Sequence, residues 1–422
     1  MKKIFESPNN THYFFGYYDK SPLNINNTKL LACRSKFCER MPTKEDILEI
    51  GYFNWRESNE FIKLTETKAW NWQQGCMLQW FAPEYDKKII YNDRVDNQFV
   101  TIILDIETEG KDILPMAYYA MSSDGKFILC IDNERHYWYR GGYNYQGIEN
   151  LDKNKPIDEN DGIWHIDIKT EEKKQIITLK ELLTIKPLSN MQNAVHYVEH
   201  LMISPNNKRF TFLHRWKMDS GAIYARLYTA NIDGTEIYLL NDSGRMSHFY
   251  WKNDTEIVGW GGLSNPINNL RKYKNIAKYF IKPLLPIYHK LINGNSTISN
   301  MVSGDSYILF KDKANKTSKI FTDRLTYDGH PSFLKNDENI MITDIYPDKN
   351  DHFYQKLYIC DLKTNEVKEI DRIKHNKDFA NSGCRCDLHP KISHDGKYVC
   401  IDTLSEQTRG MSLYEIKDMK SE

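Results

Sequence analysis

Residues 119–132 read YAMSSDGKFILCID, which is an apolar run, a polar turn and a second apolar run. The Asp-Gly pair in the middle favours a tight turn, and the apolar residues on either side favour β-strands. The stretch therefore predicts a β-hairpin. It decides the fold because variants of it recur along the whole chain.

Seven copies of this hairpin pattern are present. They begin at Tyr17, Gln79, Tyr119, Leu201, Phe249, Pro331 and Pro390. A second hairpin with a polar turn follows them at variable distance, and the last one lacks its return strand. Two hairpins make a four-stranded antiparallel sheet, and seven such sheets around an axis make a β-propeller.

We therefore predict an all-β fold, a seven-bladed β-propeller that forms one domain over residues 1–422. Residues 3–6 are expected to supply the missing strand of the last blade and to close the ring, which removes exposed edges. The alternative is a β-sandwich or two separate β domains, since each repeat alone is only a pair of hairpins. Seven copies spread over the chain favour the propeller.

One segment departs from the repeat. Residues 266–292 have helix-like apolar spacing with lysines between, followed by Pro283 and Pro286. They predict an inserted helix that packs over the propeller rim. The alternative is a basic amphipathic segment that makes a peripheral membrane contact or covers the substrate groove.

Composition narrows the classes of partner. The chain has 57 basic and 57 acidic residues, so no global field attracts nucleic acid, and we expect no nucleic-acid partner. The first 22 residues contain no long apolar run, which predicts neither a signal peptide nor a transmembrane helix and makes the cytoplasm the expected location. The oligomeric state cannot be inferred from the sequence.

Two neighbouring repeats carry histidine, arginine and tyrosine in clusters. The first cluster follows the expected inner strand FILCID (127–132) and comprises His136, Arg140 and Tyr143. The second comprises His196, Tyr197, His200, His214 and Arg215. Adjacent blades would bring both clusters to one mouth of the channel. Arginines, histidines and tyrosine hydroxyls suit an anionic substrate from which a proton is removed.

Several motifs carry a family resemblance. RHYWYRGGYNYQG (135–147) resembles the His and Arg-Pro-Gly-Tyr-Gly-Tyr pattern of ulvan lyases, with Gly141 in place of the proline. Four other stretches also look like that family: HYVEHLMISPNNKRFTFLHRW, FFGYYDKSP, DGHPSF and CDLHPKISHDGKY. More distantly, the chain resembles oligogalacturonate lyases, which are seven-bladed propellers.

The resemblance implies a polysaccharide lyase that cleaves a uronic-acid-containing glycan by β-elimination. It implies His136 as a catalytic histidine, Tyr197 as the base or acid, and Arg215 as the partner of the substrate carboxylate. His196 and His200 lie close enough in sequence to take the role of Tyr197. Arg140, Tyr143, His196 and His214 are further substrate-binding candidates.

Two other functions stay open from the sequence. One is a non-catalytic glycan-binding propeller that acts in surface-polysaccharide assembly. The other is a hydrolase, although the only nearby carboxylates are Glu134 and Glu199, and glycoside hydrolysis ordinarily needs a pair.

Three later repeats place a histidine near the start of the repeated strand: His248, His330 and His389. Equivalent positions in successive blades face the same end of the channel, so the imidazoles can converge. With Cys386, or Cys384 if the register differs, they predict a four-coordinate structural zinc site. The ulvan lyases, which this chain resembles, also hold a structural metal. The alternative is that each histidine only hydrogen-bonds a neighbouring blade.

Overall fold

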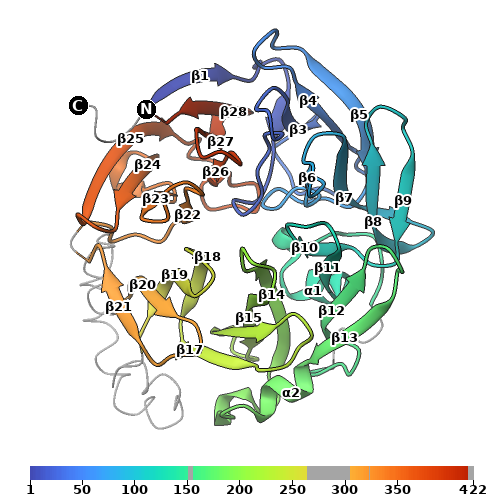
Figure 1. Cartoon of the computed structure of the whole chain (residues 1–422), viewed down its shortest axis with the longest axis vertical. Coiled ribbons are helices and arrows are strands. Elements are labelled where there is room, and N and C mark those ends of the chain that lie inside the picture. The colour runs from blue at the N-terminus through green and yellow to red at the C-terminus, as the bar shows by residue number, and fades with distance from the viewer. Residues whose placement is uncertain (151–154, 264–304, 323, 417–422) are drawn as a thin grey trace.

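Seven four-stranded antiparallel sheets are arranged as blades around a central channel (Figure 1). The computed structural model describes residues 1–150, 155–263, 305–322 and 324–416, and the sheets are counted within these ranges. The predicted seven-bladed β-propeller is confirmed. The helical insertion predicted at 266–292 lies outside the described residues.

The strands of each blade follow one another from the channel outward. The first two blades comprise β2 (His12–Phe14), β3 (Leu30–Ser35), β4 (Leu48–Phe53), β5 (Phe61–Thr67), then β6 (Gln79–Trp80), β7 (Lys88–Val95), β8 (Gln98–Asp105), β9 (Lys111–Leu114). The next two comprise β10 (Tyr118–Met121), β11 (Phe127–Ile131), β12 (Gly162–Asp167), β13 (Lys173–Thr178), then β14 (Val195–Ile203), β15 (Arg209–Lys217), β16 (Ile223–Asn231), β17 (Tyr238–Gly244).

The last three blades have the same order. They comprise β18 (Met246–Trp251), β19 (Glu256–Gly262), β20 (Asp305–Lys311), β21 (Thr317–Ile320), then β22 (Ser332–Phe333), β23 (Ile340–Asp344), β24 (Tyr354–Asp361), β25 (Glu366–Lys374), and finally β26 (Lys391–Ile392), β27 (Tyr398–Ser405), β28 (Thr408–Glu415) with β1 (Lys2–Glu6). The described helices are short: α1 (Asn133–Tyr139), η1 (Gly141–Tyr143), α2 (Leu179–Thr184), η2 (Ser189–Met191) and η3 (Lys349–Asp351). No helix of the described ranges has the length and apolar character that crossing a bilayer demands.

The repeated Ser-x-Asp-Gly-Lys turn has a clear physical basis. The Ser122 hydroxyl accepts hydrogen bonds from the backbone N–H groups of Lys126 (3.0 Å) and Phe127 (3.2 Å), which closes the turn between β10 and β11. Gly125 has φ +69°, and a Cβ there would meet the carbonyl oxygen of Ala82 at 2.3 Å. The turn therefore requires glycine at this position. Ser393 closes the equivalent turn of the last blade in the same way.

The ring closes between the two ends of the chain. β1 pairs antiparallel with β28, and Figure 1 shows the blue N-terminal strand beside the red C-terminal one. The predicted closing strand is confirmed, and it begins at Lys2 instead of at residue 3. The Phe5 ring is 6% exposed and lies 5.4 Å from the ring of Phe53 in the first blade, so closure also joins two hydrophobic cores.

One prediction about strand order was wrong. FILCID was expected to be an inner strand, but it forms β11, the second strand from the channel, and β10 is innermost. The error arises because both strands of the hairpin are buried, so apolar content does not distinguish them. The HYWYRGGYNY stretch then leaves the sheet as α1 and η1, with Asp132 as the N-cap of α1.

Candidate active site

One mouth of the channel contains a polar pocket of about 380 Å³. It is built by residues of β14, β15 and β18 and by the loops that adjoin the innermost and second strands of other blades. Its wall comprises Gln73, Arg140, Gly142, Tyr143, His200, Arg215, Ser247, His248, Tyr346, Ser382, Gly383 and Arg385. Three of these residues are arginines, so the pocket has the charge expected for an anionic ligand.

A buried carboxylate, Glu199, organises one side of the pocket. It forms ion pairs with Arg140 (Nε to Oε2, 3.3 Å) and with Arg215 (Nε to Oε1). His136 lies on the same carboxylate, with Nε2 3.1 Å from Oε2. The amide of Asn144 donates to His136 Nδ1 (3.0 Å), which leaves the proton on Nε2 for Glu199.

The charge state of Glu199 follows from these neighbours. Burial opposes its ionisation, but the guanidinium groups of Arg140 and Arg215 hold its pKa well below the usual value. Glu199 is therefore an anion that fixes two guanidinium groups in place. Only one negative charge faces the two arginines, so a positive charge remains for a ligand.

The backbone of β14 explains how Glu199 and His200 both reach this region. Tyr197 and Arg215 lie opposite each other across β14 and β15, and Glu199 shares their face of the sheet. His200 would point to the other face in a regular strand, but a register shift follows Glu199 and His200 adopts φ +56°. This β-bulge turns the imidazole into the pocket.

His200 is held by two tyrosines. The Tyr17 hydroxyl donates to His200 Nδ1 (2.6 Å), and the Tyr119 hydroxyl lies 3.3 Å from the same nitrogen. His200 Nε2 lies 3.4 Å from Glu199 Oε1. Burial lowers the pKa of His200 well below its usual value, so the imidazole is neutral.

Tyr143 and His248 flank His200. Their ring centroids lie 6.0 and 6.1 Å from that of His200. The Arg140 guanidinium stacks over the Tyr143 ring at 4.2 Å. Burial raises the pKa of Tyr143, although Arg140 opposes the shift, so its hydroxyl is protonated at neutral pH.

His248 has the features of a general base. Its Nδ1 lies 3.1 Å from Asp328 Oδ1, which places the proton on Nδ1 and leaves the Nε2 lone pair available. Burial lowers the pKa of His248, against the opposing effect of Asp328, so the ring is neutral at pH 7. The Tyr346 hydroxyl lies 3.4 Å from Nε2.

The structure brings together only part of the predicted site. The predicted catalytic and substrate-binding residues that line the pocket are Arg140, Tyr143, His200 and Arg215, and the predicted metal ligand His248 lines it as well. His136 and Tyr197 lie behind the wall. Tyr197 is 1% exposed, its ring stacks on Tyr139, and its hydroxyl has no hydrogen-bond partner in the described part of the chain.

His196 and His214 lie on the opposite face of the blade. His196 Nδ1 and His214 Nε2 are 3.0 Å apart, and His196 Nε2 donates to the carbonyl of Met191 (2.9 Å). Strand alternation separates them from Tyr197 and Arg215. They form a buried pair that does not reach the pocket.

Sequence reasoning missed Arg385. Its guanidinium donates two hydrogen bonds to Asp387, from Nε to Oδ1 (2.7 Å) and from an amino nitrogen to Oδ2 (2.9 Å). Arg385 also lines the pocket. It belongs to the CRCDLH stretch, where cysteines and histidine had suggested only a metal site. The arginine between two cysteines was the available signal.

The three predicted histidines of the later blades do converge. The ring centroids of His330 lie 4.2 Å from those of both His248 and His389. His330, His389 and Asp387 place ligand atoms within 4.8 Å of one another, so they form a group that can hold a metal ion. His330 Nδ1 donates to Asp344 (2.9 Å) and His389 Nδ1 to the carbonyl of Gly16 (3.0 Å). These anchors leave both Nε2 atoms free as ligands.

Cys386 is not part of this group, and Asp387 stands in its place. Cys386 packs into the hydrophobic core with Cys384 and Cys400, and its sulfur contacts the carbonyl of Asp387 at 3.8 Å. In this group a carboxylate oxygen therefore takes the place of the predicted thiolate.

A second cavity of about 300 Å³ adjoins the first, because both are lined by Gly142 and Gly383. Trp70 and Tyr137 supply aromatic surface to it, and Lys68 lies at its wall. The Gly141-Gly142 pair thus passes between the two cavities with no side chain to block them.

Comparisons with known proteins support the fold. No family model and no curated protein matches the chain. Among solved structures, the oligogalacturonate lyase of Vibrio parahaemolyticus is 13% identical, with a TM-score of 0.63 over 98% of this chain and 93% of that one. An oligogalacturonate lyase in complex with manganese is 14% identical, with a TM-score of 0.61 over 97% and 92%.

The same fold also occurs without that activity. A chain of the hydrazine synthase from Kuenenia stuttgartiensis is 10% identical, with a TM-score of 0.50 over 95% of this chain and 96% of that one. At such identities the likeness establishes the seven-bladed architecture, and function has to be argued from the site.

Proposed function

We propose that this protein is a lyase that cleaves uronate-containing oligosaccharides by β-elimination. The observation that carries the proposal is the convergence of Arg140, Arg215 and Arg385 on one pocket that also contains the neutral imidazole of His248 and the hydroxyl of Tyr143. Two carboxylates, Glu199 and Asp387, face the three arginines. The remaining positive charge matches a substrate carboxylate.

In the proposed reaction the arginines bind the uronate carboxylate and make the neighbouring C5 proton more acidic. His248 Nε2 removes that proton, and Asp328 stabilises the imidazolium that forms. The C4–O4 bond breaks as the C4–C5 double bond forms. The Tyr143 hydroxyl donates its proton to the departing O4 oxygen. His200 lies between the base and the acid.

The residues predicted as catalytic from the sequence keep roles in this scheme. His200 is the second candidate for the base, because it lines the same pocket. His136 and Tyr197 act as positioning residues behind the wall, since His136 contacts Glu199 and the Tyr197 ring packs against His136. Arg215 keeps its predicted role as carboxylate partner.

We also propose that His330, His389 and Asp387 hold a divalent metal, with zinc as the expected ion because two imidazoles and a carboxylate suit it. The related fold in complex with manganese supports a metal in this architecture. When bound, the ion would add positive charge beside Arg385 and fix the imidazole stack. A cytoplasmic location stays a prediction that cell fractionation would test.

A panel of uronate polymers and oligomers tests the lyase proposal. Unsaturated uronate ends absorb ultraviolet light that the saturated substrate does not, so wild-type protein should produce rising absorbance with at least one substrate. Arg215→Met should reduce kcat/KM by about a hundredfold or more, because a charge contact to the substrate is lost. Arg372→Met, on an exposed arginine of β25, is the matched control and should retain activity.

Folded wild-type protein that gives no absorbance change with any uronate substrate would contradict the lyase proposal. Measurable binding of the same glycans without turnover would instead favour the non-catalytic glycan-binding alternative. In that case Arg215→Met should weaken binding, because the arginine pocket is the feature that both functions share.

A further inference from the structure

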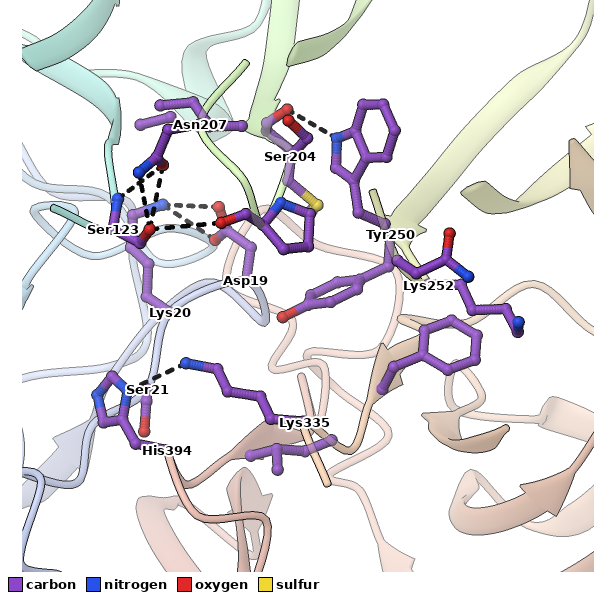
Figure 2. A pocket seen from close by; sticks show the side chains of 18 of the residues that line it. Asp19, Lys20, Ser21, Ser123, Ser204, Asn207, Tyr250, Lys252, Lys335 and His394 are labelled. Carbon is purple, nitrogen blue, oxygen red and sulfur yellow. Dashed lines mark hydrogen bonds and ion pairs between the residues drawn. The ribbon is translucent and has the colours of Figure 1, made fainter. Parts of the chain in front are cut away.

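The opposite mouth of the channel contains a second and larger pocket, of about 590 Å³ (Figure 2). It is lined by the turns between the first and second strands of the blades, which include Ser123, Asn207 and Lys252. Tyr18 separates it from the candidate active site. The Tyr18 ring packs against His248, His330 and His389, and its hydroxyl donates to the carbonyl of Phe249 (2.7 Å).

The charges of this pocket leave one cation without an acidic partner. Its lining contains Lys20, Lys252 and Lys335, together with Asp19, Asp254 and Glu338. Lys20 pairs with Asp19 (2.8 Å), and Lys252 pairs with Glu256 (2.7 Å) and Glu338 (3.5 Å). No carboxylate of the described residues forms an ion pair with Lys335, whose ammonium instead donates to His394 Nδ1 at 3.2 Å.

Two hydrogen-bond donors in the same pocket also lack partners among the described residues. Because His394 Nδ1 accepts from an ammonium, the imidazole carries its proton on Nε2, and that buried nitrogen has no partner among the described residues. The Ser21 hydroxyl is likewise buried without a partner in the described part of the chain. A buried donor without a partner is costly, and a ligand that accepts from it removes the cost.

Aromatic surface faces these donors. Figure 2 shows the Tyr250 side chain reaching across the pocket with its hydroxyl in the open middle, and Lys335 meeting His394 on the facing wall. The Tyr250 ring lies 6.3 Å from that of Phe333 and 6.4 Å from that of Tyr18. Such a surface with scattered hydroxyl and amide groups is typical of small-molecule sites.

We propose that this pocket is a second ligand site for a sugar monocarboxylate, whose carboxylate binds Lys335 and accepts from Ser21 while a sugar hydroxyl accepts from His394 Nε2 and the ring packs against Tyr250. Lys335 is the lysine of this pocket that pairs with no described carboxylate, so one carboxylate is the group that it would bind. The sugar class rests on the proposed function, since product released at one mouth would be the available ligand.

Isothermal titration with D-galacturonate, and with neutral D-galactose as its counterpart, tests this site in the full chain. Wild-type protein should bind galacturonate at the two mouths. Lys335→Gln should weaken one of these binding events by about tenfold or more, since a charge-assisted contact is lost. Ser21→Ala should weaken the same event. Lys363→Gln, an exposed lysine of the same blade, should change nothing.

The variants separate this proposal from the lyase proposal. Arg385→Gln should remove only the other binding event. If wild-type protein binds one galacturonate and Lys335→Gln abolishes it, the second site stands and the active-site assignment fails. The proposal is overturned if folded Lys335→Gln and Ser21→Ala bind galacturonate as wild type does, or if galactose binds equally well at this site.

Discussion

At the scale of single residues, Glu199 has the widest influence in the candidate active site. It is fully buried, and Arg140, Arg215 and His136 all contact its carboxylate. A buried carboxylate with such partners is expensive to replace, because its removal leaves guanidinium groups without a counter-charge. The sequence places Glu199 near the predicted histidines, but only the fold shows that it joins two blades.

Glu199→Gln is the sharpest test of this arrangement. The substitution keeps the size of the side chain and removes its charge, so we expect the free energy of unfolding to fall by roughly 3 kcal/mol. Activity should fall further than stability explains, since Arg140 and Arg215 lose their fixed positions. Glu366→Gln, at an exposed site on β25, is the control. Chemical denaturation and steady-state kinetics that do not distinguish the two variants would contradict this role.

The His196–His214 pair predicts a pH dependence of stability. Burial lowers the pKa of His196 from 6.5 to about 4, so the unfolded chain binds a proton between these values that the folded chain does not. The free energy of unfolding therefore falls as the pH drops from about 6.5 towards 4, by up to roughly 3 kcal/mol from this residue.

The variant His196→Gln tests this dependence of the free energy of unfolding on pH. The amide can still donate to the carbonyl of Met191, but it does not titrate in this range. Urea denaturation at several pH values should show a shallower loss of stability on acidification for the variant. Identical slopes for variant and wild-type protein would show that His196 is already protonated in the folded state.

At the scale of elements, the hairpin repeats could be predicted from the sequence because they depend on local patterns. The turn that contains Ser122 and Gly125 carries its own hydrogen-bonding groups, so the same sequence pattern forms the turn in several blades. The β-bulge at His200 could not be predicted, since the alternation of side chains along β14 gives no indication of a positive φ. Asp387 was missed because Cys386 beside it is the more familiar metal ligand.

Closure of the ring by β1 makes a prediction at this scale. Phe5 is buried between the last and first blades, whereas Lys3 of the same strand is exposed. Phe5→Ala should lower the free energy of unfolding by about 3 kcal/mol. Lys3→Ala should change it by less than about 0.5 kcal/mol. Equal effects in thermal denaturation would mean that β1 does not stabilise the closed ring.

At the scale of the whole molecule, the channel contains a stack of rings between two pockets of different character. Tyr17, Tyr18 and the histidines of the later blades fill its middle. The arginine pocket lies on one side and the lysine pocket on the other. The sequence predicted this convergence of histidines, because equivalent positions of a propeller meet at the axis. It did not predict a second pocket, whose lining comes from turns of many blades.

The metal group predicts a measurable property of the whole protein. Protein purified without added metal should contain about one divalent ion per chain by elemental analysis, and a chelator should lower its melting temperature. Asp387→Asn should reduce the metal content, whereas Asp361→Asn, on a distant turn, should not. A metal content near zero in folded wild-type protein would refute the site.

The proposed β-elimination is tested most directly by the mass balance of its products. Wild-type protein and a uronate trisaccharide are incubated together, and the molecular masses of all products are measured by mass spectrometry. Elimination adds no water, so the account predicts that the product masses sum to the mass of the substrate and that Arg215→Met forms almost none. Products whose masses exceed the substrate by one water would show hydrolysis and contradict the account, as would the absence of any cleavage.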